Sequence, residues 1–307
     1  MKHLFIVNPA AGGHDASEEV RARVEAAFAS RTDEFEIYTT KGPMDAADKI
    51  RAEAEKGEPL RVYACGGDGT FNECVCGAAG RPNVAVCPFP TGTGNDFCRM
   101  FGAEKDCFRD LDALLDGWEH PMDLIECNGR YSANICSVGI DARVGCSVHK
   151  YGRLGAFGYV VSLLDNVRRG LTSEMRVRVG DQYRSEGKHT LVCVCNGRFY
   201  GGGFNPSADA RPDDGELDIY VIDGVSIVKA AILIGKYASG RGREVPKYIH
   251  FFRGTEVEIE LDRPDSINVD GEELIADRVT FRLVPGATRL IVPATMHFFD
   301  DRKPQKS

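Results

Sequence analysis

Apolar and polar positions alternate along the first third of the chain in a way that predicts strands and helices in turn. Short apolar runs at 3–7, 34–40, 61–65 and 83–87 predict strands. Between them lie polar segments with a helical stripe, clearest at 15–30, where Val20, Val24 and Phe28 share one face. Segments 44–56 and 70–79 are predicted as the next helices. Repeated strand–helix units indicate a parallel sheet with helices on both faces.

The pattern changes near Asp123. Strands at 124–127 and 131–138 are joined by Asn128-Gly129, a pair typical of a two-residue hairpin turn. Helices are predicted at 154–169 and 226–238, and 300–307 has no regular pattern. Turn residues separate the remaining predicted strands, which favours an antiparallel sandwich or barrel. These strands lie at 175–179, 190–196, 217–222, 257–261, 266–269 and 279–284.

Charge follows the same division of the chain. The 307 residues have a formal net charge of -8, and residues 1–122 carry all of this excess, with 13 basic and 21 acidic residues. An acidic chain is a poor candidate for general nucleic-acid binding. Six basic residues and one acid lie within 229–253. Such a stretch can dock on anionic lipid or phosphate, although its spacing alone favours an ordinary solvated surface.

Membrane spans and a metal-binding cysteine motif are both disfavoured. The longest uncharged stretch, 82–95, contains three prolines and is shorter than the roughly 20 apolar residues that a span needs. The first apolar run is short for a signal peptide and is better explained as a strand. Of eleven scattered cysteines, only Cys74/Cys76 and Cys193/Cys195 are close pairs. Without a second pair at zinc-finger spacing, buried reduced thiols of a cytoplasmic protein are favoured over zinc.

Glycine-rich turns are the strongest candidates for chemistry. Residues 66–70, Gly-Gly-Asp-Gly-Thr, follow a predicted strand and precede a helix, so glycines and backbone N–H groups can approach a phosphate. The sequence matches neither the Walker A nor the dinucleotide-binding pattern. Two similar turns, 8–13 and 90–97, follow other strands. Because the carboxyl ends of parallel strands meet at one edge, the three turns indicate a shared phosphate site.

Carboxylates accompany these turns. Asp68 and Asp96 lie within two of them, and Asp123 starts the second region. Three acids near a phosphate site suggest a hydrated divalent cation, because Mg²⁺ keeps several waters and takes few carboxylates. The acidic segments 213–216 and 270–272 are most simply interpreted as turns when each is taken in isolation.

Taken in order, these motifs resemble the soluble bacterial diacylglycerol kinases and YegS-like lipid kinases, relatives of the catalytic domains of eukaryotic diacylglycerol and sphingosine kinases. The resemblance runs from Asn8 to about Pro293. It rests on an ordered set of short segments: the Asn-Pro turn at 8–12, 66–73, Gly-Thr-Gly-Asn-Asp-Phe at 92–97, 137–142, Asn196 with the glycines at 201–203, 214–218 and 270–272.

The resemblance implies two domains. Residues 1–122 would form an α/β nucleotide-binding domain with a flavodoxin- or phosphofructokinase-like parallel sheet, completed by 290–307. Residues 123–289 would form a β-sandwich domain for the lipid substrate. ATP would lie in the cleft between them.

The resemblance also implies roles for particular residues. Asp68, Asp96 and Asp123 would organise a water-bridged Mg²⁺ at the nucleotide. A separate structural Mg²⁺ would be held by the Asp214 side chain and the carbonyls of Arg211 and Glu216. Glu272 would be the general base, with Asp270 beside it and Asp68 as a further catalytic residue. ATP would be contacted by Asn8, Pro9, Ala10, Ala11, Gly12, Thr40, Gly66, Gly67, Asp68, Gly69, Thr70, Phe71, Asn72, Glu73 and Thr93.

The implied activity is ATP-dependent phosphorylation of a hydroxyl group of diacylglycerol or a similar lipid, giving a phospholipid such as phosphatidic acid. The enzyme would be cytoplasmic and peripherally attached to the inner face of the membrane. A homodimer is one oligomeric state that the sequence allows. One departure concerns Gly13-His14, where many relatives have a lysine. This difference bears on phosphate affinity, since histidine is charged only below about neutral pH.

Two alternatives remain open. An NAD kinase or sugar-phosphate kinase would need a compact polar acceptor site, whereas a lipid kinase needs an apolar one. Tyr159, Val160, Leu163 and Leu164 are apolar candidates for that site, although core packing is the simpler use of most of them. A nucleotide- or lipid-binding regulator without catalysis would be expected to lack Asp68 or Glu272, and both are present.

Overall fold

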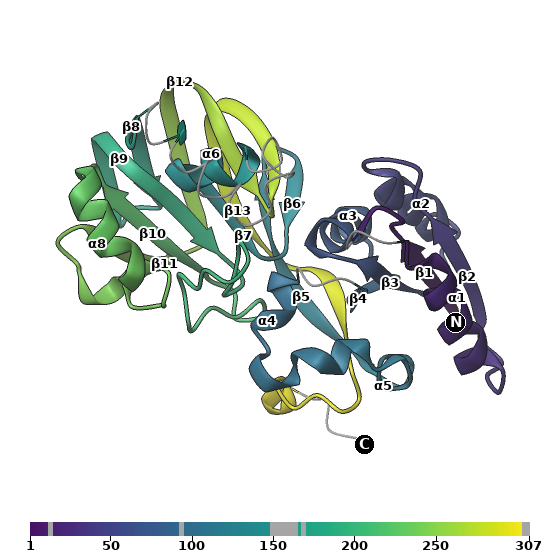
Figure 1. The fold of residues 1–307 in the computed structure, drawn as a ribbon. Helices are drawn as coiled ribbons and strands as arrows, with labels where there is room; N and C mark the ends of the chain where they lie inside the picture. Colours follow the sequence, from purple (N-terminus) through teal and green to yellow (C-terminus); the bar gives the residue numbers. More distant parts are fainter. Residues whose placement is uncertain (12–14, 92–94, 148–164, 167–169, 303–307) are drawn as a thin grey trace. The chain divides into compact units, whose positions relative to one another are not determined.

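The computed structural model describes the chain except for residues 12–14, 92–94, 148–164, 167–169 and 303–307 (Figure 1). The described chain divides into two compact units. Unit 1 comprises Met1–Met122 and Gly286–Ser307, and unit 2 comprises Asp123–Pro285. The long strand β13 (Glu272–Val292) starts in unit 2 and ends in unit 1.

Unit 1 is built on parallel strands. The order is β2 (Glu34–Thr39), β1 (Lys2–Val7), β3 (Leu60–Gly66), β4 (Val84–Pro90) and the end of β13, where Arg289 and Leu290 pair with β4. All of these pairs are parallel. β3 and β4 are buried along their whole length, which fits their continuous apolar sequences. The edge strand β2 is half-exposed.

Helices connect these strands. α1 (Ser17–Phe28) buries Val20, Val24 and Phe28, which confirms the predicted helical stripe. α2 (Asp45–Ala54) and α3 (Asp68–Ala78) follow β2 and β3. After β4 come the short helix α4 (Asp96–Arg99), a 3₁₀ helix over Gly102–Arg109, and α5 (Leu111–Leu115).

The C-terminal segment packs on these short helices. Phe298 and Phe299 lie against Phe101, with ring centroids 4.9 and 5.9 Å apart. The Glu104 carboxylate accepts the backbone N–H groups of His297 and Phe298. Residues nearly 200 positions apart in the chain therefore share one core.

Unit 2 is antiparallel and nearly all β. Its strands are β5 (Trp118–Cys127, which begins in unit 1), β6 (Arg130–Ser132), β7 (Ile135–Gly139), β8 (Ser173–Val179), β9 (Tyr183–Cys195), β10 (Leu217–Asp223), β11 (Ile249–Gly254), β12 (Glu256–Val269) and the first part of β13. The described helices are α6 (Ile140–Ser147), α8 (Ile227–Tyr237) and a 3₁₀ turn at Gly242–Glu244.

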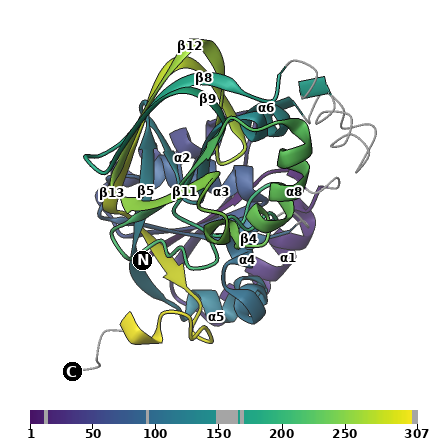
Figure 2. The same ribbon diagram turned by 90° about the vertical axis from the view of Figure 1, so that its left-hand side faces the viewer.

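Long strands close the sheet of unit 2 on itself. The first half of β9 pairs with β8 and its second half with β7, and β12 divides in the same way between β8 and β7. Figure 2 shows β8, β9 and β12 bending over together. β12 has an irregular register between Glu260 and Asp265, at the point where its partner changes. The sheet therefore folds into two layers, as in a sandwich. β9 and β12 each run through both layers, so no separate loop has to connect the layers at these strands.

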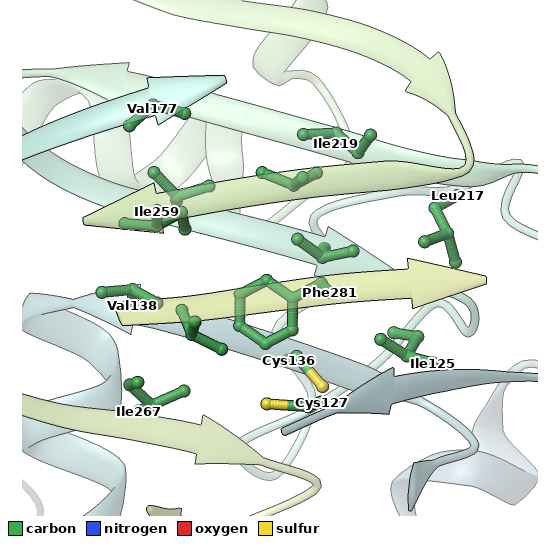
Figure 3. Packing of buried hydrophobic residues seen from close by; sticks show 14 of the residues in the cluster. Ile125, Cys127, Cys136, Val138, Val177, Leu217, Ile219, Ile259, Ile267 and Phe281 are labelled. Atoms are coloured by element: carbon green, nitrogen blue, oxygen red, sulfur yellow. The ribbon is translucent and has the colours of Figure 1, made fainter. Parts of the chain in front are cut away.

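The main core of unit 2 lies inside this closed sheet. Figure 3 shows the ring of Phe281 from β13 among Cys136 and Val138 from β7 and Ile267 from β12. Phe281 and its neighbours are almost completely buried. A second cluster, on the other face of β9 and β10, joins these strands to α6 and α8 through Ile140 and Tyr237.

Several predicted elements differ from the observed ones. Asn128-Gly129 does form a two-residue hairpin turn, with positive φ at both residues and Cys127 paired with Arg130. The predicted strand 131–138 is split into β6 and β7, because the intervening N–H groups bind the Asp270 carboxylate. Strands predicted at 257–261 and 266–269 form one strand, β12. β11 was missed, and nearly all of the predicted helix 154–169 lies outside the described residues.

We expect Phe281→Ala to lower the free energy of unfolding of unit 2 by about 3–5 kcal/mol, because it leaves a cavity in a fully buried cluster. Chemical denaturation followed by circular dichroism measures the change. Ile275→Ala is the control, since Ile275 lies on the same strand but is 58% exposed; it should change the free energy by less than about 0.5 kcal/mol. Equal effects of the two substitutions would contradict this description of the core.

Candidate active site residues

The turns that follow β1, β2, β3 and β4 start side by side in unit 1. Val7, at the end of β1, pairs with Thr39 of β2 and Cys65 of β3. Gly66, at the end of β3, pairs with Pro90 of β4. The sheet register therefore brings the predicted phosphate turns to one edge.

Asn8 fastens the first of these turns to α3. Its backbone N–H donates to the Cys65 carbonyl at 3.2 Å. Its side-chain amide donates to Thr70 Oγ1 at 3.1 Å, and its Oδ1 accepts the Ala10 N–H at 3.0 Å. Thr40 lies close by in the sheet, since its N–H donates to the Val7 carbonyl at 2.9 Å. The sequence-predicted residues Asn8, Ala10, Thr40 and Thr70 are thus brought together.

The second turn passes directly from strand to helix. A Cβ atom on Gly66 would lie 2.3 Å from Thr70 Oγ1, so no larger residue fits there while Thr70 keeps its position. Gly67 is the extended N-cap residue of α3, which starts at Asp68, two residues before the predicted start. Asp68, Gly69 and Thr70 therefore form the first helical turn, where backbone N–H groups and the helix dipole favour anions.

Asp68 ties this turn to the third one. Its carboxylate accepts the Asp96 N–H at 2.8 Å and the Phe97 N–H at 3.2 Å, at the start of α4. The carboxylate of Asp96 is nearly buried and pairs with Arg99 at 3.0 Å. Two of the predicted carboxylates are therefore neighbours, and Asp68 has a structural part that its position in a glycine-rich turn did not reveal.

Other predicted ATP-contacting residues have different surroundings. Phe71 is buried, with its ring 4.6 Å from that of Phe97, and Asn72 is also buried, whereas Glu73 is only partly buried. Pro9, Ala11, Gly67 and Gly69 are at least partly accessible. Gly12, Gly13, His14 and Thr93 lie outside the described residues, as do Tyr159, Val160, Leu163 and Leu164.

In unit 2, Asp270 and Gly271 form a tight turn between β12 and β13. Val269 pairs with Glu272 across a two-residue loop, and both loop residues have positive φ (51° and 93°), as in a type I′ hairpin turn. The Asp270 carboxylate accepts four hydrogen bonds from the segment between β6 and β7. The donors are the Ser132 hydroxyl at 2.6 Å and the N–H groups of Ala133, Asn134 and Ile135 at 2.8, 3.2 and 2.8 Å.

Glu272 differs from Asp270 in its surroundings. It is exposed at the start of β13, and its carboxylate has no hydrogen bond or ion pair with the described part of the chain. The turn that carries it is held firmly through Asp270. This geometry separates two tasks: one carboxylate fixes the turn, and the other can accept a proton.

Asp123 is hydrogen-bonded to the acidic turn at 211–216 in unit 2. Its carboxylate accepts the Gly215 N–H at 2.9 Å, and its own N–H donates to the Pro212 carbonyl at 2.7 Å. Its carbonyl accepts the Asn196 side-chain amide at 2.8 Å. Asp123 thus contacts both Asn196 and the Asp-Gly-Glu segment at 214–216, which are separate motifs in the sequence.

The guanidinium of Arg253 is a cation at this acidic turn. It contacts the Asp214 carboxylate and lies 2.8 Å from Glu216 and 3.0 Å from the buried Asp218. Burial opposes its charge, but Asp214 and Asp218 outweigh this effect and raise the pKa of Arg253. Arg211 pairs with Asp213 at 3.0 Å.

This arrangement bears on the structural Mg²⁺ expected from the resemblance. The Asp214 carboxylate, the one side chain expected to hold that ion, already contacts the Arg253 guanidinium. Among the described residues, no group of three or more His, Cys, Asp or Glu side chains could hold a metal ion. We therefore derive no role from a metal at Asp214.

A partly buried polar network that the sequence did not predict lies at the start of α6. The Tyr200 hydroxyl donates to Asp141 Oδ2 at 2.9 Å and lies 3.1 Å from the Tyr237 hydroxyl. Burial raises the pKa of Asp141 to about 6, although hydrogen bonds from Tyr200 and the Ala142 N–H favour the ionised form. The motif at 137–142 pointed to Asp141, but no spacing in the sequence linked it to tyrosines 59 and 96 residues away.

The cysteines are free and mostly buried, as the sequence predicts. All eleven cysteines are free, and nine of them are buried, including Cys193 and Cys195, whose sulfur atoms are 3.5 Å apart. Burial raises the pKa of Cys195, which disfavours the thiolate that zinc requires. Over the described ranges, no helix has both the length and the apolar character needed to cross a membrane.

Family models match both parts of the chain. The diacylglycerol kinase catalytic domain matches residues 2–127, and the YegS C-terminal NAD kinase beta sandwich-like domain matches residues 134–292. A Pseudomonas aeruginosa protein with the name "Probable lipid kinase YegS-like" is 31% identical over 288 residues, which are 92% of each chain.

Solved structures give the same result. A crystal structure of "a putative diacylglycerol kinase" from Bacillus anthracis superposes with a TM-score of 0.72 at 26% identity, over 94% of this chain and 96% of that one. Yeast NADH kinase complexed with NADH superposes with a TM-score of 0.51 at 9% identity, over 96% of this chain and 84% of that one. The latter shows a likeness of fold alone.

We expect Arg253→Met to lower the free energy of unfolding by about 1–2 kcal/mol, because the buried Asp218 then loses one of its guanidinium partners. Thermal unfolding without nucleotide, in EDTA and in MgCl₂, measures the effect. The wild-type melting temperature should be the same in both solutions.

Arg278→Met is the control, because the exposed ion pair of Arg278 with Glu260 should contribute little. If Mg²⁺ raised the wild-type melting temperature and Asp214→Asn abolished that rise, Arg253 would not be the cation of this turn.

Proposed function

Because the chain belongs to the YegS-like lipid kinase family and is a kinase, we propose that it transfers the γ-phosphoryl group of ATP to a hydroxyl group of diacylglycerol or a similar membrane lipid. The product would be a phospholipid such as phosphatidic acid. One observation carries the proposal: the sheet register of unit 1 brings three glycine-rich turns and the N-terminus of α3 to one edge. Such an edge is suited to the phosphates of a nucleotide.

Residues of unit 1 would bind the nucleotide. The backbone N–H groups at the start of α3 would face phosphate oxygens, and Asn8 would keep the neighbouring turn against α3. Asp68 and Asp96 are neighbours and would hold a Mg²⁺ through water, because Mg²⁺ keeps several waters and takes few carboxylates. The ion would compete with Arg99 for the Asp96 carboxylate. Asp123, the third carboxylate that the resemblance implies for this ion, belongs to unit 2 and stays a prediction. When bound, Mg²⁺ would neutralise charge on the phosphates.

Glu272 would act as the general base. The acceptor oxygen attacks the γ-phosphorus, the bond from that phosphorus to the β–γ bridging oxygen breaks, and ADP leaves with the bond's electron pair. The hydroxyl proton passes to the Glu272 carboxylate, which is exposed and has no competing partner among the described residues. Asp270 would be a positioning residue, since the donors at 132–135 already engage its carboxylate.

A lipid acceptor is preferred over NAD or a sugar phosphate. The relative that covers 92% of the chain has a lipid kinase name, whereas the likeness to NADH kinase rests on fold at 9% identity. A lipid acceptor also implies peripheral contact with a membrane surface, because the substrate resides there. Labelled ATP incubated with a panel of hydroxylated lipids in mixed micelles tests the acceptor. NAD and a sugar phosphate serve as controls, and phosphorylation of either in place of the lipids would contradict the proposal.

We expect Glu272→Gln to reduce lipid phosphorylation by about 10²–10⁴-fold, because glutamine keeps the size of the side chain but cannot accept the proton. ATP affinity, measured by calorimetry, should stay near the wild-type value. Glu273→Gln is the matched control, being the next residue on β13, with its carboxylate bound to the Ser266 hydroxyl. Near-normal turnover of Glu272→Gln would show that another group is the base.

We expect Asp68→Ala to reduce turnover by at least about 10²-fold and also to lower the free energy of unfolding by about 1 kcal/mol, because α4 loses its carboxylate acceptor. Asp68→Asn keeps one acceptor oxygen and should recover part of the stability but little of the activity. Recovery of activity in step with stability would mean that Asp68 acts only through the loop structure.

A further inference from the structure

The helix α8 exposes large aliphatic side chains, which is unusual for a helix in contact with water. Four large aliphatic residues face solvent: Ile227, Val228, Ile232 and Ile234, with exposed fractions of 57, 68, 70 and 45%. Figure 1 shows α8 at the outer margin of unit 2, beside β10 and β11. In ordinary surface helices the apolar stripe faces the core and the outer face is polar.

The exposed face is continuous. At about 100° per residue, Ile234, Ile227, Val228 and Ile232 follow one another around a single arc of the helix, and the positions between them are Ala231 and Gly235. No charged or hydrogen-bonding side chain interrupts this arc. The two lysines of the helix, Lys229 and Lys236, lie together along one flank.

The opposite face fixes the orientation of the helix. Leu233 and Tyr237 are its buried residues. The Tyr237 hydroxyl lies 3.1 Å from that of Tyr200, and its ring lies edge-on to Tyr220 of β10, with centroids 6.3 Å apart. Rotation that would bury the aliphatic arc would therefore break the Tyr237 hydrogen bond and remove its buried ring from the core.

Cations border the exposed arc. The ammonium groups of Lys229 and Lys247 lie 4.8 and 5.6 Å from the ring centroid of Tyr248 and have no carboxylate partner in the described chain. Lys236 and Arg241 share one carboxylate, that of Glu244. Four cations against one acid leave a positive border beside the aliphatic arc.

The rest of the basic stretch 229–253 has another use. Arg243 pairs with Asp209 and Asp218, and Arg253 pairs with Asp214, Glu216 and Asp218. Two of the six cations are thus neutralised inside unit 2. The sequence charge alone overstates the electrostatic surface and does not reveal the aliphatic arc.

We propose that α8 inserts its aliphatic arc into the interfacial layer of an anionic lipid bilayer, with Lys229, Lys247 and their neighbours against the headgroups. The choice of a bilayer rests on the proposed function, since the acceptor lipid resides there, and on the charge of the border. An amphipathic helix with an apolar face and flanking lysines binds such a surface by burial of apolar area together with attraction to anionic headgroups.

A second copy of the chain is a poorer occupant. A two-fold interface would place the same patch on both sides, so the lysines beside Tyr248 of both copies would enter one interface without added acids. An anionic headgroup layer supplies the missing negative charge. Insertion also predicts binding that salt weakens but does not abolish, because the apolar part is not screened.

Vesicle sedimentation of the full chain tests the proposal. The probes are vesicles of pure phosphatidylcholine and of phosphatidylcholine with phosphatidylglycerol at about 3:1. Wild type should bind the anionic vesicles and keep part of this binding at high salt. Val228→Ser/Ile232→Ser should lower the partition coefficient at least about tenfold, and Lys229→Gln/Lys247→Gln should lower it mainly at low salt.

Two control variants are available. Ile275→Ser removes an aliphatic side chain that is 58% exposed on β13, and Lys105→Gln removes an exposed lysine of unit 1. Neither should change vesicle binding. Insertion itself is followed with Ile232→Trp, whose fluorescence should shift to the blue and be quenched by brominated lipids, whereas Ile275→Trp should show neither effect. Trp118 provides a constant background in both variants.

The outcomes separate this proposal from the proposed function. Wild-type binding to anionic vesicles by both α8 double variants, or an unquenched Ile232→Trp, overturns the insertion of α8 even if the enzyme phosphorylates lipids. A size-exclusion shift from dimer to monomer in Val228→Ser/Ile232→Ser, without loss of vesicle binding, also overturns it. If Val228→Ser/Ile232→Ser loses phosphorylation of lipid in vesicles but keeps full activity on a water-soluble short-chain acceptor, the result supports insertion of α8. Vesicle binding through α8 without phosphorylation of any lipid would leave insertion standing and contradict the proposed function.

Discussion

Carboxylates that accept backbone N–H groups hold several turns of this protein in place. Asp68 binds the N–H groups at the start of α4, Asp123 binds that of Gly215, and Asp270 binds three N–H groups between β6 and β7. Turns cannot satisfy their own backbone donors as helices and sheets do, and charge-assisted hydrogen bonds are among the stronger ones available. The loops therefore have defined positions although they contain many glycines.

This constraint divides the acidic residues by task. The Asp270 carboxylate accepts hydrogen bonds that hold the turn. The carboxylate of Glu272, two residues further on, is exposed. At the turn 211–216 one cation serves several acids, because the Arg253 guanidinium pairs with Asp214, Glu216 and Asp218. An acidic residue within a motif can thus have a structural contact in place of a chemical role. Several such residues hold the backbone of a turn in place.

The same distinction explains the surface around α8. Arginines drawn into ion pairs with buried or turn carboxylates no longer contribute an outward field, whereas Lys229 and Lys247 still do. The aliphatic arc of α8 costs solubility, since apolar groups in water are unfavourable, and Tyr237 prevents the helix from turning it inward. Apolar exposure and uncompensated charge therefore occur at the same place on unit 2.

The sequence by itself determined the alternation of strands and helices in 1–122, the hairpin at Asn128-Gly129 and the glycine-rich turns, because these depend on local periodicity and on φ preferences. It also identified Asp68, Asp270 and Glu272 as candidate residues, through motifs only a few residues long. Only the tertiary structure decided which carboxylates are engaged, that Tyr200 and Tyr237 meet Asp141, that Arg253 serves the acidic turn, and that β9 and β12 each serve two layers. These features depend on contacts between residues tens of positions apart, which close-range patterns of hydrophobicity cannot specify.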